Sequence, residues 1–341
     1  MRASLTTIVV ATGLALGGCS PDLQMGGVGV TPAGDAARCV ELASEIGLPL
    51  QVHRTDQFLV LSSAEDAWAS VTGRLLDRVY LRFYEQFSRA GFEPKPAPDK
   101  LIWVCFNSYG ALEAYARAAD GAEVSWMDAY YSHRTNRVAT AVAVGRPTAQ
   151  AKARPSGSSG RIAAFGDPGG GQAASGGLDI RTIIHELTHQ LAFNSGLQRR
   201  GATYPFWLTE GLATNFEADS SESIGLGRED SRYRQRLIEV KAGGRLIPLE
   251  QFVGMTEYPA GQGPATRDAY AQSWGVFHYL LESQPCALRK YMAELSSVWL
   301  PKQNTESLRR RFIAVFGPVK PLEEGFRRFI DRPYAAVGGT G

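Results

Sequence analysis

Residues 181–194 read RTIIHELTHQLAFN and place two histidines four residues apart, with a glutamate directly after the first. On an α-helix, residues four apart share one face, so His185 and His189 project together and can bind a single metal ion. Glu186 lies one residue further round, where it can act on a water molecule as a general base without being a ligand. Apolar side chains cover the other faces and predict a buried helix: Ile183, Ile184, Leu187 and Leu191.

A third metal ligand is predicted in residues 205–217, which read PFWLTEGLATNFE. A catalytic zinc ion is held by three protein ligands and keeps one position open. Glu210 follows His189 with twenty residues between them, which leaves room for a turn and a second helix packed against the first. Glu217 lies two helical turns beyond Glu210, on the same face. It is expected either to hydrogen-bond a ligating histidine or to be a helix charge facing solvent.

These two segments, in this order and at this spacing, resemble the gluzincin metallopeptidases, in which HExxH is followed by a separated glutamate ligand. WLTEGLA is similar to the W-L-x-E-G-x-A segment of the aminopeptidase branch. HELTHQL together with WLTEGLATNFE is more similar to bacterial peptidase-MA-like domains of unassigned function. The resemblance implies one Zn²⁺ ion held by His185, His189 and Glu210, with water in the fourth position. It also implies peptide hydrolysis, in which Glu186 accepts a proton from that water.

Residues 270–280, YAQSWGVFHYL, contain a predicted contact for the reacting group. In the aminopeptidase relatives, the tyrosine of a Y-x-K-G segment points at the oxyanion of the tetrahedral intermediate; the Lys-Gly pair is absent from this chain. The resemblance assigns Tyr270 as a donor to the developing negative charge. The alternative is a tyrosine that anchors the start of a helix. His278 is either a second candidate donor or a histidine that packs its helix.

A strand that binds extended substrate is predicted near the metal helix. Residues 125–131, SWMDAYY, lack the glycine and the asparagine of the Gly-x-Met-Glu-Asn segment that binds a substrate amine in the aminopeptidases, so this role is not assigned here. In related peptidases an edge strand above the zinc helix pairs with the substrate backbone. Residues 137–144 are the candidate for that strand, and the alternative is a strand in the core.

The N-terminus resembles a bacterial lipoprotein signal peptide, residues 1–19. Arg2 precedes an apolar run too short to span a bilayer comfortably, and Leu16-Gly-Gly-Cys19 resembles a lipobox. The resemblance implies a lipid anchor on Cys19 and a flexible tether at 20–36. Because Ser20 follows rather than aspartate, the outer membrane, facing the periplasm, is the expected location. The alternative is an ordinary cleaved signal.

The hydrophobic pattern predicts an α+β fold, and the resemblance implies a zincin, thermolysin-like catalytic domain. A small mixed sheet with helices precedes a mostly helical half that carries the HExxH helix. Strands are predicted at 57–62, 101–106 and 137–144, and Ser108 and Asp179 are predicted to cap helices. After the HExxH helix, further helices are predicted at 208–218, 232–241, 268–283, 286–297, 306–316 and 322–330. The predicted divisions are an α/β subdomain at 37–145, a Gly/Ser-rich loop at 146–178, a helical subdomain at 179–334 and a tail at 335–341. The loop is interpreted as either a tolerated insertion or a lid. The basic and apolar residues of 307–330 predict a helix that packs on its own domain or lies on a membrane.

The predicted function is that of a membrane-anchored zinc metallopeptidase that hydrolyses peptide bonds in the cell envelope. The chain has 36 Lys and Arg against 34 Asp and Glu, so no nucleic-acid partner is expected. One alternative is a non-catalytic, zinc-stabilised envelope module that binds a partner. Such a structural site would be closed by a fourth protein ligand and would not need Glu186. Another is a core helix that binds no metal.

Overall fold

The computed structural model describes most of the chain from residue 37 onward. The described residues are 37, 40–41, 43–44, 47–63, 66–124, 127–142, 179–220, 222–257, 264–297 and 303–333. The predicted signal peptide with Cys19, the tether, the loop at 146–178 and the tail lie outside them. Within the described ranges, no helix is long and apolar enough to cross a membrane.

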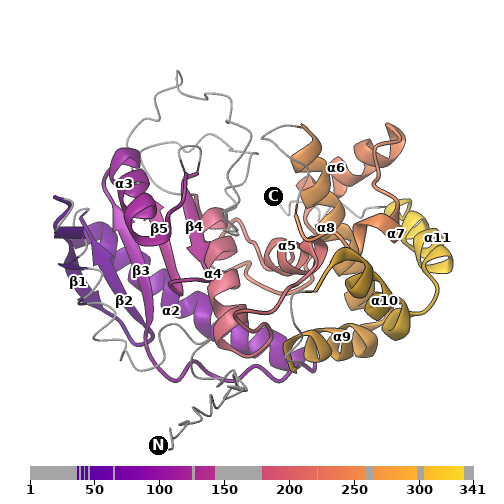
Figure 1. Cartoon of the computed structure of the whole chain (residues 1–341), viewed down its shortest axis with the longest axis horizontal. Helices are drawn as coiled ribbons and strands as arrows, with labels where there is room; N and C mark the ends of the chain where they lie inside the picture. Colours follow the sequence, from indigo (N-terminus) through magenta and orange to yellow (C-terminus); the bar gives the residue numbers. More distant parts are fainter. Residues whose placement is uncertain are drawn as a thin grey trace, which may run out of the picture.

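The strands of the described residues form one five-stranded mixed sheet in the order β1-β2-β3-β5-β4. The strands are β1 (Gln51–Arg54), β2 (Phe58–Ser62), β3 (Leu101–Phe106), β4 (Ala129–Ser132) and β5 (Arg137–Ala141). The central strands β2, β3 and β5 run parallel, and β1 and β4 are antiparallel edges (Figure 1). The sequence predicts the three central strands, whereas both edge strands have four residues, too few for a clear period of two.

The prediction that residues 137–144 form the edge strand is wrong. That strand ends at Ala141 and lies between β3 and β4. The edge beside the metal helix belongs to β4, which forms a hairpin with β5. Asn136 closes this hairpin in the left-handed region, with φ 57°, a conformation that asparagine tolerates better than most residues.

Helices cover both faces of the sheet, and the strand residues alternate between them. Val60 and Trp103 pack on the side of α2 (Asp66–Arg89), while Leu61 and Val104 pack on the side of α3 (Tyr109–Asp120). Strands that are buried on both faces are expected for parallel pairing, where crossover helices lie above and below. The first core continues from α2 into the helical half, so the sheet and the helices share one interior.

The second half of the chain is a layer of helices beside the sheet (Figure 1). Its members are α4 (Ile180–Asn194), α5 (Phe206–Thr214), α6 (Ser231–Ala242), α7 (Leu249–Phe252), α8 (Pro264–Ser283), α9 (Pro285–Ser297), α10 (Thr305–Phe316) and α11 (Val319–Ile330). All except the short α7 overlap a helix predicted from the sequence. The fold is therefore α+β, as predicted, with a mixed sheet first and a mostly helical half after it.

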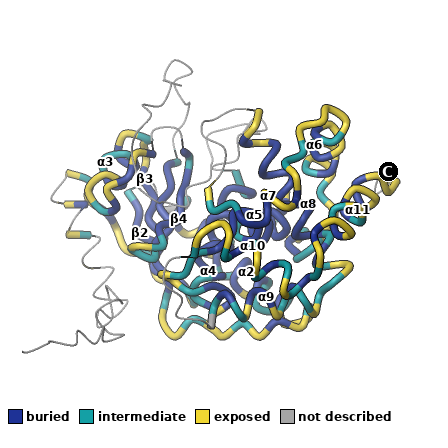
Figure 2. The backbone as a smooth tube through the Cα atoms, turned by 45° about the vertical axis from the view of Figure 1, so that its right-hand side comes forward, coloured by how far each residue is buried: buried dark blue, intermediate teal, exposed yellow. Residues whose placement is uncertain are grey.

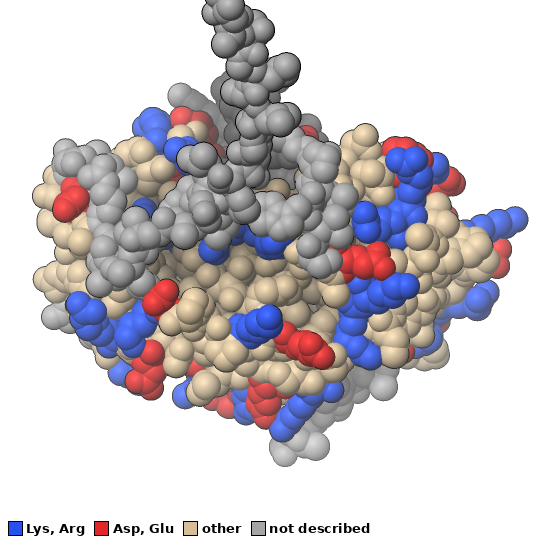
Figure 3. Space-filling view, turned by 60° about the horizontal axis from the view of Figure 1, so that its bottom comes forward, with Lys and Arg blue, Asp and Glu red and all other residues tan. Residues whose placement is uncertain are grey.

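The C-terminal helices α10 and α11 pack on their own domain. Phe312, Phe316, Phe326 and Phe329 are buried in the shared core, while the basic residues between them lie nearer the surface. Figure 2 shows the same alternation of buried and exposed backbone along α11. On the face seen in Figure 3, basic and acidic side chains are interspersed over the described surface. The interpretation of 307–330 as a helical segment packed on its own domain is supported.

Close contact between α5 and α8 depends on a glycine. A Cβ atom added at Gly211 would lie 2.6 Å from the carbonyl oxygen of Ser273 and 2.7 Å from Cβ of Phe277. Both atoms belong to α8, and neither is the end of a flexible side chain. The absence of a side chain at position 211 thus sets how near α5 approaches α8.

We expect Gly211→Ala to lower the free energy of unfolding by about 1–3 kcal/mol, because the added methyl group overpacks a tight helix crossing. Urea denaturation followed by circular dichroism measures the change. Gly110→Ala is the matched control: Gly110 lies on α3 with no atom within 4 Å of an added Cβ. That control should be neutral or up to ~1 kcal/mol more stable. Equal stability of the two variants would contradict the prediction.

Candidate metal centre

Helix α4 places the predicted histidines at the junction of the sheet and the helical layer. Asp179 caps its N-terminus by accepting a hydrogen bond from the Arg181 backbone N–H, as predicted. Residues 181–192 are all buried, which makes α4 a central helix rather than an amphipathic surface helix (Figure 2). The chain turns away after Asn194, and Gly196 adopts a positive φ of 81° just beyond the end.

The third predicted ligand reaches the same point from α5. Glu210 lies in the middle of this nine-residue helix, and its side chain is 1% exposed. Helix α5 ends at Thr214, four residues earlier than predicted, so Glu217 follows the helix rather than sharing its face. Glu217 nevertheless contacts His185, because the chain turns back toward α4 after the end of α5.

The three predicted ligand atoms form a small triangle. His185 Nε2 lies 3.1 Å from His189 Nε2 and 3.3 Å from Glu210 Oε2, and His189 Nε2 lies 3.6 Å from the same oxygen. Ligands about 2.0–2.1 Å from a tetrahedral zinc ion are roughly 3.3–3.4 Å apart. The triangle therefore has the size that one such ion needs, and this buried group can hold a metal ion.

The three predicted ligands and their neighbours shift one another's pKa values. Burial disfavours the charged form of His185, but hydrogen bonds with Glu210 and Glu217 outweigh it and raise its pKa well above the ordinary value. Burial lowers the pKa of His189. Burial would raise the pKa of Glu210, yet the two histidines hold it below its usual value. The pKa shifts of the two histidines thus have opposite directions, and His185 is the one that also pairs with Glu217.

A second layer of side chains surrounds the histidine ligand. His185 Nδ1 lies 2.7 Å from Glu217 Oε1, so an Nδ1–H donor leaves Nε2 with its lone pair toward the ion. The Tyr233 hydroxyl donates to both carboxylate oxygens of Glu217, at 3.0 and 3.1 Å. Arg181 lies 3.7 Å from Glu217 and 2.6 Å from Asp230. The interpretation of Glu217 as a histidine partner agrees with this geometry.

Sequence reasoning did not identify Tyr233 or Arg181 as part of this layer. Asp230 offered a partial signal, because it precedes the predicted helix at 232–241 and caps α6 through its side chain. An N-cap at Asp230 places Tyr233 in the first turn of the following helix, α6. It does not indicate that the turn packs against α4, which only the folded chain shows.

Glu186 is held by the edge strand. The backbone N–H of Tyr131 on β4 donates to Glu186 Oε2 at 2.7 Å. Glu186 is fully buried and directly follows the ligand His185 in α4. The contact to Tyr131 comes from the main chain of a strand that sequence reasoning missed.

Tyr270 lies against the metal centre, whereas His278 is engaged elsewhere. The ring of Tyr270 is 6.2 Å from that of His185 and meets Phe206 edge-on at 5.7 Å. Helix α8 begins at Pro264, so Tyr270 does not anchor the start of the helix. His278 Nδ1 pairs with Asn215 at 3.0 Å, and its Nε2 lies 3.3 Å from Glu282. His278 is therefore a packing histidine in this structure.

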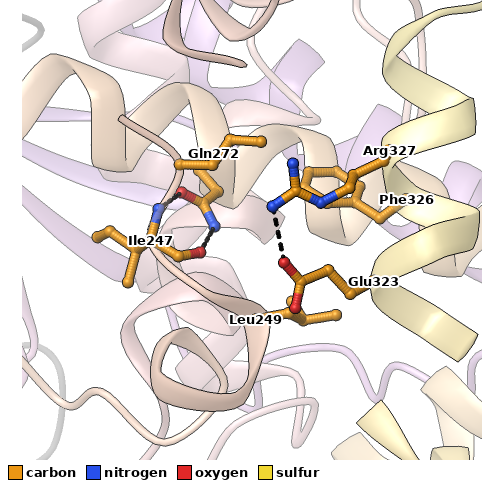
Figure 4. Close-up of a pocket in the computed structure, with 7 residues that line it drawn as sticks. Ile247, Leu249, Gln272, Glu323, Phe326 and Arg327 are labelled. Atoms are coloured by element: carbon orange, nitrogen blue, oxygen red, sulfur yellow. Dashed lines mark hydrogen bonds and ion pairs between the residues drawn. The ribbon is translucent and has the colours of Figure 1, made fainter. Parts of the chain in front are cut away.

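A surface hollow on the other side of α8 is a weaker candidate site. It is a shallow depression between α8 and α11 with almost no enclosed space for a water molecule (Figure 4). Its polar groups already bond one another: Gln272 pairs with both backbone groups of Ile247, and Glu323 pairs with Arg327. Gln272 follows Tyr270 by two residues, about 200° round the helix, so the hollow faces away from the metal centre.

The comparisons with known proteins match the part of the chain that carries this centre. Residues 179–299 match a family described as "Protein of unknown function (DUF1570)". This stretch includes the three metal-binding side chains, Glu186, Glu217, Tyr233 and Tyr270, and the description names no activity. A search of curated proteins finds no match.

We expect the purified protein to bind one divalent ion per chain and His189→Ala to lose it. Removal of one of three ligands should weaken binding by more than the roughly 10–100-fold typical of an outer-shell change. Elemental analysis after dialysis measures metal per chain. His53→Ala is the control, since His53 lies on β1, at the opposite edge of the sheet from β4. If the two variants retained metal equally, the assigned ligand set would be wrong.

Proposed function

We propose that this protein is a zinc-dependent hydrolase of peptide bonds. The observation that carries the proposal is the buried triangle of His185, His189 and Glu210, with the buried Glu186 next to His185 in the sequence of the same helix. Two imidazole nitrogens and one carboxylate oxygen are the donor set of many catalytic zinc sites. Within the described ranges the group has three members, which leaves a tetrahedral ion one position for solvent or substrate.

The residues of the chain divide the chemistry between them. A bound zinc ion would supply Lewis acidity and lower the pKa of a coordinated water to about 7. Glu186 acts as the general base that takes a proton during attack and returns it to the leaving amine. The Tyr131 N–H supports this role, because its hydrogen bond fixes the orientation of the Glu186 carboxylate. Tyr270 donates from its phenol to the oxyanion.

Within the described ranges β4 is the last strand of the sheet, and its outer edge supports binding of an extended peptide. Ala141 N–H bonds to Asp128 O, and Ala129 pairs with Thr140 and Tyr131 with Val138. In an antiparallel ladder this register turns the backbone groups of positions 129 and 131 away from β5. The contact from Tyr131 N–H to Glu186 has this direction. We infer that a substrate strand added to this edge lies beside the general base.

The cellular setting remains part of the proposal and rests on the sequence alone. Acylation of Cys19 would anchor the enzyme to the bacterial envelope, facing the periplasm, where peptides and proteins are its substrates. A non-catalytic zinc-stabilised envelope module is the other candidate. The three-member ligand group and the adjacent buried Glu186 favour the hydrolase, because a structural site has four protein ligands and no use for a base.

We expect Glu186→Gln to retain the metal and lose about 10²–10⁴-fold in turnover, since the amide cannot accept the proton. Digestion of a peptide library, read by mass spectrometry, measures activity, and elemental analysis measures metal. Glu324→Gln, on the exposed side of α11, is the matched control and should be fully active. Cleavage by the Glu186 variant at the wild-type rate would remove the assigned role of Glu186.

Tyr270→Phe tests the oxyanion contact. We expect turnover to fall about 10²–10³-fold, as for removal of one oxyanion donor, while metal content and KM change little. His278→Asn is the comparison, because it alters the other residue considered for this role. A larger loss of turnover in the His278 variant than in the Tyr270 variant, with both folded, would reverse the assignment.

A further inference from the structure

The carboxylate of Glu217 is enclosed by groups from two helices. Its side chain is 1% exposed and lies between His185 and the Tyr233 hydroxyl. Two cations are close to one of its oxygens: Arg181 at 3.7 Å and Arg232 at 3.5 Å. A carboxylate taken out of water is stable only when it is paired in this way. These contacts hold the carboxylate of Glu217 beside Nδ1 of His185.

The enclosing groups are fixed to one another at the start of α6. The side chain of Asp230 accepts hydrogen bonds from the backbone N–H groups of Arg232 and Tyr233, at 2.9 and 3.4 Å. Its other oxygen pairs with Arg181, in the first turn of α4, at 2.6 Å. One residue thus caps α6 and binds the helix that carries the histidine ligands. The position of Tyr233 relative to His185 is set by this connection.

The direction of the Glu217 carboxylate decides which nitrogen of His185 is available to the ion. A neutral imidazole has one N–H donor and one acceptor nitrogen, and the partner of the first determines the second. Glu217 accepts from Nδ1, so Nε2 is the ligand atom and faces His189 and Glu210. Tyr233 donates to both Glu217 oxygens and opposes rotation of the carboxylate away from Nδ1.

We propose that Tyr233 is a positioning residue of the metal centre, which sets metal affinity through Glu217 and the tautomer of His185. The inference rests on the proposed metal site but not on the reaction catalysed there. The ring of Tyr233 stacks on Trp274, with centroids 6.2 Å apart and planes at 15°. A phenylalanine at this position keeps that packing, so the hydroxyl can be removed without emptying the site.

The test is a double-mutant cycle on zinc affinity, measured with Zn²⁺ against a competing chromophoric chelator at constant pH. Glu217→Ala should weaken binding about 10–100-fold, as expected for an outer partner of a histidine ligand. Tyr233→Phe should weaken it by a smaller factor, roughly 3–10-fold, because it loosens that partner without removing it. The double variant should bind as Glu217→Ala does, within about twofold, because Tyr233 acts through Glu217.

Tyr291→Phe is the matched control: this buried tyrosine also loses only a hydroxyl, for which the described residues offer no hydrogen-bond partner. Its zinc affinity should equal that of the wild type. Unchanged affinity in Tyr233→Phe, or a full Tyr233 effect persisting in Glu217→Ala, would overturn the inference while leaving the metal site intact. Absence of zinc binding in the wild type would overturn the inference together with the site.

Histidine ring ¹⁵N chemical shifts provide a readout that folding alone does not move. In the zinc-bound wild type, His185 should show a protonated Nδ1 and a ligated Nε2. In Tyr233→Phe the Nδ1 proton should exchange faster with solvent, since its acceptor is less firmly held. An Nδ1 signal with unchanged exchange, measured beside the Tyr291 control, would count against the positioning role.

Discussion

The structure depends on the burial of two imidazoles and one carboxylate at the contact of α4 and α5. Polar groups removed from water need partners, and an unpartnered carboxylate in a core is strongly destabilising. His185, His189 and Glu210 are each almost fully buried, and their ligand atoms lie within 4.8 Å of one another. A single divalent ion would satisfy all three at once. The packing of α4 against α5 therefore also determines where the buried carboxylate of Glu210 lies.

Helix α4 also links the metal centre to the sheet, through a stripe of side chains spaced four residues apart. Glu186 accepts from Tyr131, and Gln190 donates to the carbonyl oxygens of Ile102 and Asn136. Asn194 and Asn136 exchange amide hydrogen bonds at 2.8 and 2.9 Å. These contacts join one helix face to β3 and to the β4–β5 hairpin. The edge of β4 is consequently held in a fixed register with the histidines on the same helix.

Much of the fold was predictable because the governing patterns are local. The central strand β3 is a continuous apolar run, and Ser108 and Asp179 cap their helices through their side chains. The prediction of an edge strand at 137–144 was wrong. The position of a strand in a sheet depends on which strands pair with it, and the sequence of a five-residue strand does not indicate its partners. Strand β4 was missed for the related reason that it is short and buried.

The sequence by itself determined that His185 and His189 share a helix face, since the i and i+4 spacing follows from the geometry of the helix. It also indicated Glu210 as their partner, through a resemblance rather than through spacing. Only the tertiary structure decided that the three ligand atoms meet, that Glu217 reaches His185 from beyond the end of α5, and that Tyr131 and Tyr233 complete the surroundings. Those contacts join segments far apart in the chain, and such segments are brought together by packing of the whole core, not by local periodicity.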